Sequence, residues 1–268
     1  MSLPLAALFG NLPPLIGMVH LAPLPGSPRW GGSLDAVLER ALADACILRD
    51  AGFDGLVVEN YCDVPFYPES VPPETVAAMA VCVREVVNAV TIPVGVNLLR
   101  NDGPGAVAIA AVTGARFVRI NVHTGMMATD QGLLSGRAYE TTRLRQRLGA
   151  DVAIFADVWV KHATPFPGAE LEQAAEDAYY RGLADALIVT GSGTGKTTDL
   201  ARVELVKRAV PQAPVFIGSG LAPESAAHAL SVADGAIVGS SICREGTAGA
   251  GIDPVRARAL LTTVRVER

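Results

Sequence analysis

Short runs rich in valine, isoleucine and leucine recur along the whole chain, and each is followed by a loop and a segment of helical periodicity. This alternation is typical of βα units, in which consecutive strands run parallel and a helix makes each crossover. The pattern predicts eight strands, at Leu15–His20, Gly55–Asn60, Ile92–Asn97, Phe117–Asn121, Ala153–Val158, Ala186–Thr190, Pro214–Ser219 and Gly235–Ser240.

Residues between the predicted strands carry signals for the start and end of helices. Ser33 is placed to cap the first helix, and Gly52 is placed to end it. Pro72 and Pro73 indicate the start of the second helix, and Asp253 and Pro254 indicate the start of the last, because proline is favoured at the beginning of a helix. These boundaries support one helix in each interval between strands.

Eight βα units with no signal for an antiparallel hairpin fit either a closed barrel or a doubly wound sheet. Most of the predicted strands end in polar residues, as expected if all of them open into one shared mouth, and this favours a (βα)8 TIM barrel. No linker or composition shift divides residues 1–268, so we expect a single domain. Residues 1–14 form either a cover over one end of the barrel or an arm.

Composition and charge exclude several classes of partner and location. Half of the 268 residues are apolar, and the net charge of -5 gives no electrostatic footprint for nucleic acid. Four widely spaced cysteines suit neither a zinc site nor a disulfide framework, and they favour a reducing cytoplasm. Six prolines interrupt residues 1–28, which argues against a signal peptide or a transmembrane segment.

Two glycine-rich loops follow the seventh and eighth predicted strands. In a TIM barrel these loops lie next to each other, and their backbone N–H groups can surround a phosphate. Glycine allows the anion a close approach to the backbone, and serine adds hydroxyl donors. The predicted phosphate-binding residues are Gly218, Ser219, Gly220, Gly239, Ser240 and Ser241.

The stretch 190–197 (TGSGTGKT) has a superficial likeness to a nucleotide-binding P-loop. The spacing excludes this interpretation, because the position that needs the first glycine is Thr190. We interpret the stretch as a mobile loop over the mouth that brings Lys196 or Thr197 to a substrate, with a merely flexible loop as the alternative.

Three charged residues lie within the strand patterns, where burial without a partner is costly: Glu59, Arg119 and Asp157. Arg119 and Asn121 are two residues apart and share the inward face of their strand. Arg119 either neutralises one of the two carboxylates or holds a polar group of the substrate. The two carboxylates are the predicted acid and base, and Phe155 and Trp159 should desolvate Asp157 and favour its neutral form.

Histidines and lysines at the mouth raise two further hypotheses. His20 and His123, with Glu59 and Asp157, could ligate a divalent metal, but strand one lacks the H-x-H pair of metal-dependent hydrolases. We therefore expect no cofactor, with a metal-dependent hydrolase as a minor alternative. An imine-forming lysine would be expected within a strand, and the three lysines fall in loops or a helix, which argues against imine chemistry.

The segment 14–28 (PLIGMVHLAPLPGSP) resembles the N-terminal signature of the BtpA/SgcQ family, and similarity continues through 54–60, 95–97, 119–121, 157–158 and 190–191. The resemblance implies a barrel of the ribulose-phosphate-binding type. One branch of this family is named for photosystem I biogenesis, and other members are associated with sugar metabolism.

Our main functional hypothesis is an isomerase, epimerase or lyase that acts on a phosphorylated small molecule. The predicted catalytic residues are Glu59, Asp157, Arg119 and His20, and the predicted substrate-binding residues are Asn97, Asn121, His123, Thr190 and Lys196. The rival hypothesis is a non-catalytic factor for assembly of a membrane complex. Whether the chain forms a homo-oligomer stays open at this point.

Overall fold

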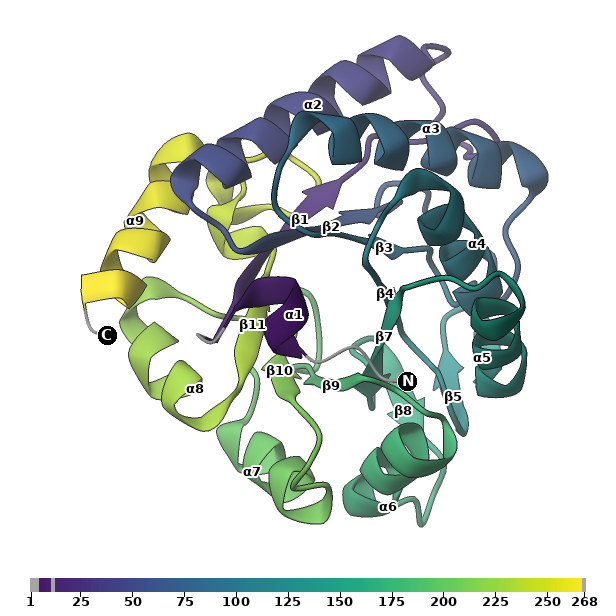
Figure 1. Ribbon diagram of the computed structural model, residues 1–268, viewed down its shortest axis with the longest axis vertical. Helices are drawn as coiled ribbons and strands as arrows, with labels where there is room; N and C mark the ends of the chain where they lie inside the picture. The colour runs from purple at the N-terminus through teal and green to yellow at the C-terminus, as the bar shows by residue number, and fades with distance from the viewer. Residues whose placement is uncertain (1–4, 11–12, 267–268) are drawn as a thin grey trace.

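The computed structural model describes residues 5–10 and 13–266, and its centre is a closed barrel of parallel strands inside a ring of helices (Figure 1). Around the barrel the strands follow the order β1-β11-β10-β9-β7-β4-β3-β2. Their bounds are β1 Leu15–His20, β2 Gly55–Glu59, β3 Val94–Asn97, β4 Phe117–Ile120, β7 Ala153–Val158, β9 Ala186–Val189, β10 Val215–Ile217 and β11 Gly235–Val238. Each lies within one of the predicted strands, so the predicted TIM barrel is confirmed.

Helices cover the outside of the barrel. The Ser33 hydroxyl accepts a hydrogen bond from the backbone of Ala36, and Gly52 ends the same helix with φ of 99°, as the sequence predicts. The helices are α2 Leu34–Ala51, α3 Pro73–Ala89, α4 Gly103–Thr113, α5 Ala138–Arg147, α6 Leu171–Glu176, α7 Leu200–Ala209, α8 Ala226–Val232 and α9 Pro254–Val266. A π-helical turn, Asp177–Arg181, continues α6. Within the described residues, every helix is too short or too polar to cross a membrane.

Alternation along each strand separates two apolar layers. On β4, Val118 and Ile120 belong to the outer layer, between strands and helices, whereas Phe117 belongs to the layer inside the barrel. The rings of Phe117, Phe155 and Phe216 fill the interior, with successive centroids 4.9 and 5.1 Å apart. Because apolar side chains fill the barrel, polar chemistry is confined to its ends.

The short helix α1, Leu5–Phe9, closes the amino end of the barrel. Phe9 packs edge-on against Phe117, with ring centroids 5.7 Å apart, and Leu8 joins the interior apolar layer. Figure 1 shows α1 in the middle of the ring of helices. Within the described part of residues 1–14, the chain is therefore a cover rather than an arm, and access to the barrel is through the opposite end.

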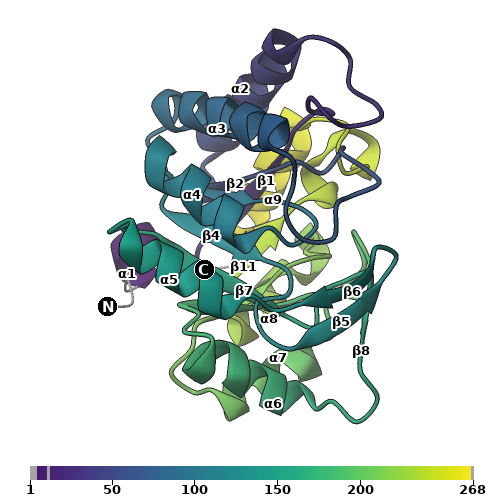
Figure 2. The same cartoon turned by 90° about the vertical axis from the view of Figure 1, so that its right-hand side faces the viewer.

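A small antiparallel sheet corrects the prediction that the chain has no hairpin. It contains β5 Met126–Thr129, β6 Gly132–Ser135 and β8 Ala163–Pro165 in the order β6-β5-β8. The turn at 130–131 is Asp-Gln and lacks the Asn-Gly or Asp-Gly signal of tight hairpins, so the strands escape detection. Figure 2 shows this sheet projecting from the barrel on the side away from α1.

The packing of α1 can be tested by truncating Leu8. We expect Leu8→Ala to lower the free energy of unfolding by about 2 to 3 kcal/mol, because it leaves a cavity under the cover. Urea unfolding would measure this change. Val112→Ala, at a position on α4 that is 72% exposed, is the matched control and should cost less than about 0.5 kcal/mol. Equal effects of the two substitutions would mean that α1 does not seal the barrel.

Candidate active site

Two cavities that share lining residues lie at the carboxyl ends of the barrel strands. The larger, which we call the mouth cavity, has a volume of about 820 Å³, and Glu59, Arg100, Arg119 and Lys161 are among its lining residues. The smaller, which we call the loop cavity, has a volume of about 30 Å³ and lies against residues 218–221 and 239–241. Glu59, Arg119 and Lys161 line both cavities, so a single ligand could extend from one to the other.

A buried ion pair joins β4 and β7 at the floor of the mouth. The Arg119 Nε and Nη2 atoms donate to the two oxygens of Asp157, at 3.2 and 3.0 Å, and the two side chains are 2% and 0% exposed. Of the roles left open for Arg119, the neutralisation of Asp157 is therefore the one observed. The sequence predicts Phe155 and Trp159 as the main surroundings of the Asp157 carboxyl, whereas in the structure both of its oxygens accept hydrogen bonds from the Arg119 guanidinium.

A chain of amide groups extends the ion pair toward β3. The Asn121 side chain donates to Asp157 at 2.9 Å, and the Asn97 side chain donates to the Asn121 oxygen at 3.2 Å. Asn121 lines the mouth cavity, whereas Asn97 lies beneath it, and no group in the described part of the chain donates to the Asn97 oxygen. The two predicted substrate-binding asparagines are thus brought together, and Asn121 is the one that a ligand can reach.

Glu59 lines the mouth and, among the described residues, has no lysine or arginine nitrogen within 4 Å. Burial raises its pKa, and nearby Asp157 adds to this effect, while the positive charges of Arg119 and Lys161 oppose it. The carboxyl lines both cavities. A carboxyl whose neutral form is favoured at a substrate cavity can hold a proton and exchange it with a ligand.

His20 lies next to Glu59 in its uncharged form. Its Nε2 atom is 3.7 Å from a Glu59 oxygen, and its Nδ1 atom accepts a hydrogen bond from the backbone of Gly249. Because Nδ1 is an acceptor, we place the proton on Nε2, toward the carboxyl. Burial lowers the pKa of His20 to about 3, with a further contribution from the charge of Lys161, so the ring orients groups rather than supplying positive charge.

The six predicted phosphate-binding residues all line the loop cavity. Across residues 5–10 and 13–266, the N–H groups of Gly220, Ser240 and Ser241 have no hydrogen-bond acceptor. Unpaired backbone N–H groups that converge on one space favour an anion. At about 30 Å³, however, the cavity has room for one or two water molecules, which is too little for a phosphate.

The glycine-rich segment 191–197 restricts the loop cavity. The Ser219 hydroxyl donates to the Lys196 carbonyl, and the backbone of Gly191 donates to that hydroxyl. Glycine is required at Gly220, where φ is 72° and a Cβ would lie 2.4 Å from the Lys196 oxygen. A phosphate would therefore enter only if this segment moves away.

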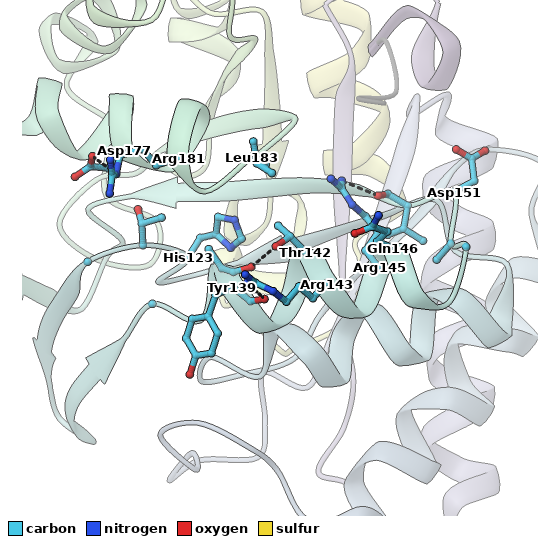
Figure 3. A pocket seen from close by; sticks show the side chains of 17 residues that line it. His123, Tyr139, Thr142, Arg143, Arg145, Gln146, Asp151, Asp177, Arg181 and Leu183 are labelled. Carbon is cyan, nitrogen blue, oxygen red and sulfur yellow. Dashed lines mark hydrogen bonds and ion pairs between the residues drawn. The ribbon is translucent and has the colours of Figure 1, made fainter.

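Three predicted substrate-binding residues lie outside the two cavities. The Thr190 hydroxyl accepts a hydrogen bond from the backbone of Lys161, and the Lys196 side chain is exposed outside both cavities. His123 lines a separate outer groove of about 880 Å³ between α5 and the Asp177–Arg181 turn (Figure 3). Its Nε2 atom is 2.7 Å from the Gly182 oxygen, and burial lowers its pKa to about 4.

The sequence pattern did not identify two cationic residues of the mouth, Arg100 and Lys161, as site residues. Arg100 is buried, and its Nη2 atom donates to the Lys161 carbonyl at 2.8 Å. Burial lowers the pKa of Lys161 to about 8, and the charge of Arg119 acts in the same direction. Both residues follow predicted strands by only a few positions, which is the signal that could have found them. Among the described residues, no three His, Cys, Asp or Glu side chains are grouped so as to hold a metal ion.

Comparison with protein families and curated proteins gives consistent matches over nearly the whole chain. The family described as "BtpA family" matches residues 11–266. The photosystem I biogenesis protein BtpA of Synechocystis is 48% identical over 92% of this chain and 86% of its own length. The putative sgc region protein SgcQ of Escherichia coli is 30% identical over 97% of both chains.

Comparison with solved structures supports the fold. The N-(5'-phosphoribosyl)anthranilate isomerase of Pyrococcus furiosus superimposes with a TM-score of 0.58 over 96% of this chain and all of that one. Sequence identity is 15%, so the similarity extends to the barrel architecture and no further.

The buried ion pair makes a direct stability prediction. Asp157→Asn should lower the free energy of unfolding by about 3 kcal/mol, because it leaves the Arg119 charge buried without its partner. The matched control is Asp151→Asn, which removes the exposed Arg116–Asp151 pair, whose N–O distance is 2.9 Å, and should cost less than about 1 kcal/mol. Urea unfolding of both variants measures the difference. Similar losses of unfolding free energy in the two variants would contradict the expectation that a buried ion pair costs more to break than an exposed one.

The raised pKa of Glu59 makes stability depend on pH in a defined direction. Folding favours the neutral acid, so its contribution is fully present below the pKa of an unfolded glutamate and is lost as pH rises through the folded-state pKa. Glu59→Gln should therefore be more stable than the unsubstituted protein at pH 8, on the order of 1 kcal/mol, and the gap should close toward pH 4.

Unfolding curves at several pH values measure this gap for Glu59→Gln and for the control Glu85→Gln, which is exposed on α3. A Glu59→Gln protein that is less stable at pH 8 would show that neighbouring cations outweigh the cost of burying the carboxylate.

Proposed function

The chain belongs to the BtpA family, and from that premise we propose that it is an enzyme acting on a phosphorylated small molecule by proton transfer. The observation that carries this proposal is that one cavity, the loop cavity, is lined both by residues with unpaired backbone N–H groups and by a carboxyl group. Residues 220, 240 and 241, whose backbone N–H groups are unpaired among the described residues, line the same loop cavity as Glu59.

The phosphate would bind to the two loops that follow β10 and β11. Backbone N–H groups there are pre-oriented by the loops, so binding an anion costs little reorganisation. The segment 191–197 would open to admit the phosphate and close over the bound ligand, which also excludes water from the reacting groups. The name of the structurally similar phosphoribosyl isomerase refers to a phosphorylated compound and is consistent with this ligand class.

Proton transfer would depend on Glu59. Its carboxyl faces both cavities, and a proton held there can pass to or from a carbon or oxygen atom of a ligand in the mouth cavity. Neutral His20 would keep the carboxyl oriented. In this proposal Asp157 is not the second acid or base, because it holds Arg119, whose guanidinium lines the mouth and can contact a ligand oxygen.

The second candidate function is a non-catalytic factor for photosystem I biogenesis. The name of the Synechocystis relative supports it, since that protein is 48% identical to this chain. The two functions differ in one measurable respect, because an assembly factor has no need of a small phosphorylated ligand.

Thermal unfolding with a panel of sugar phosphates and inorganic phosphate tests ligand binding. A ligand at 100 times its Kd should add about 2.7 kcal/mol, which raises Tm by roughly 5 to 10 °C. Ser240→Asp places a negative charge on the loop cavity and should weaken binding roughly tenfold or more. Ser231→Asp, at an exposed position of α8, is the control and should bind normally.

Proton transfer is then tested with whichever compound raises Tm. In deuterated water the enzyme should exchange a carbon-bound hydrogen of that compound, as followed by proton NMR. Glu59→Gln should lose the exchange and keep the Tm shift. No Tm shift with any phosphorylated compound would overturn the proposal and favour the assembly factor. A Tm shift with unchanged exchange in Glu59→Gln would remove Glu59 from the chemistry.

A further inference from the structure

Lys161 is a nucleophilic group in the mouth to which the proposed function gives no role. It lines both the mouth cavity and the loop cavity, on the wall that the two spaces share. Its charge interacts with Glu59 and Asp157, and in the described part of the chain its amine has neither a hydrogen-bond acceptor nor an ion-pair partner within 4 Å. A lysine amine without a partner beside a ligand cavity is free to react with the ligand.

The backbone of Lys161 is fixed although it lies outside a strand. Its N–H donates to the Thr190 hydroxyl at 2.9 Å, and its carbonyl accepts from the buried Arg100 guanidinium at 2.8 Å. One partner follows β9 and the other follows β3, so the residue is anchored between two parts of the barrel rim. This anchoring removes the objection that only a lysine within a strand would be positioned well enough for imine formation.

The surroundings of Lys161 also favour its free amine. Burial lowers the pKa of Lys161 to about 8, and the positive charge of Arg119 contributes in the same direction. Near pH 8 the neutral amine, which is the nucleophilic form, is therefore far more populated than it is in an exposed lysine.

We propose that Lys161 forms an imine with the aldehyde or ketone group of a phosphorylated substrate, an inference that rests on the proposed function. The amine nitrogen bonds to the carbonyl carbon, and the nitrogen gives up a proton to the oxygen of the resulting carbinolamine. Glu59 supplies one further proton, and the oxygen leaves as water with rupture of its bond to carbon. The product is a protonated imine, with no oxidation or reduction, and it draws electrons from the adjacent carbon.

This chemistry narrows the substrate class to phosphorylated aldehydes and ketones. With the phosphate in the loop cavity, the rest of the molecule extends past Lys161 into the mouth cavity, because that residue lines both. The positive charge of Arg100 at the mouth favours an anionic substrate of this kind. Glu59 then lies on the same walls as the imine and can take a proton from the carbon next to it.

Borohydride trapping tests the inference. The full-length protein is incubated at pH 8 with dihydroxyacetone phosphate or glyceraldehyde 3-phosphate, sodium borohydride is added, and each lysine peptide is analysed by mass spectrometry. Hydride from borohydride reduces an imine to a stable secondary amine. The chain has three lysines, Lys161, Lys196 and Lys207, so the two others serve as internal controls.

We expect at least ten times more adduct on Lys161 than on Lys196 or Lys207, loss of that adduct in Lys161→Arg, and no change in Lys207→Arg, whose position on α7 lies outside both cavities. Inorganic phosphate should reduce the labelling if it competes at the loop cavity. Equal labelling of all three lysines would overturn the inference. A Tm shift with either compound, without adduct on Lys161, would overturn imine formation and leave the proposed phosphate site standing. Neither a Tm shift nor an adduct would overturn both.

Discussion

The cost of burying charge at the end of an apolar barrel is the constraint on which the mouth depends. Below the strand ends the interior is filled by aromatic and aliphatic side chains, so a guanidinium there requires a partner. Arg119 finds it in Asp157, and two asparagines extend the same network. Because Arg119 already pairs with Asp157, burial is the main influence on the pKa of Glu59.

In this arrangement, neighbouring titratable side chains at the mouth have different roles. Asp157 holds Arg119 in place, burial keeps His20 neutral, and the proposed chemistry uses Glu59 and Lys161. The shift in pKa of both of these groups has the same principal cause, which is loss of contact with water. Closure of the segment 191–197 over a ligand would reinforce that cause.

Much of the fold could be predicted from the sequence because local periodicity determines it. The inward direction of Arg119 follows from simple alternation along β4, and the helix limits at Ser33 and Gly52 follow from capping chemistry. Contacts between distant segments could not be predicted in this way. The choice of Asp157 as the partner of Arg119 depends on strand order and side-chain reach, which no single segment encodes.

The same limit explains what sequence analysis misplaced at the site. His123 follows a strand end and still turns away from the mouth toward the Gly182 carbonyl. Lys161 looks like an ordinary loop residue until its contacts with Thr190 and Arg100 are known. The β5–β6 hairpin has a turn without the usual dipeptide, so periodicity alone could not reveal it.

The central claim is that the loops after β10 and β11 bind the phosphate of a ligand once the segment 191–197 moves. A crystal structure of the protein soaked in inorganic phosphate tests this most directly. The account predicts a phosphate bound to the N–H groups of Gly220, Ser240 and Ser241, with residues 193–196 displaced from the loop cavity. An unoccupied loop cavity with that segment in place at saturating phosphate would contradict it.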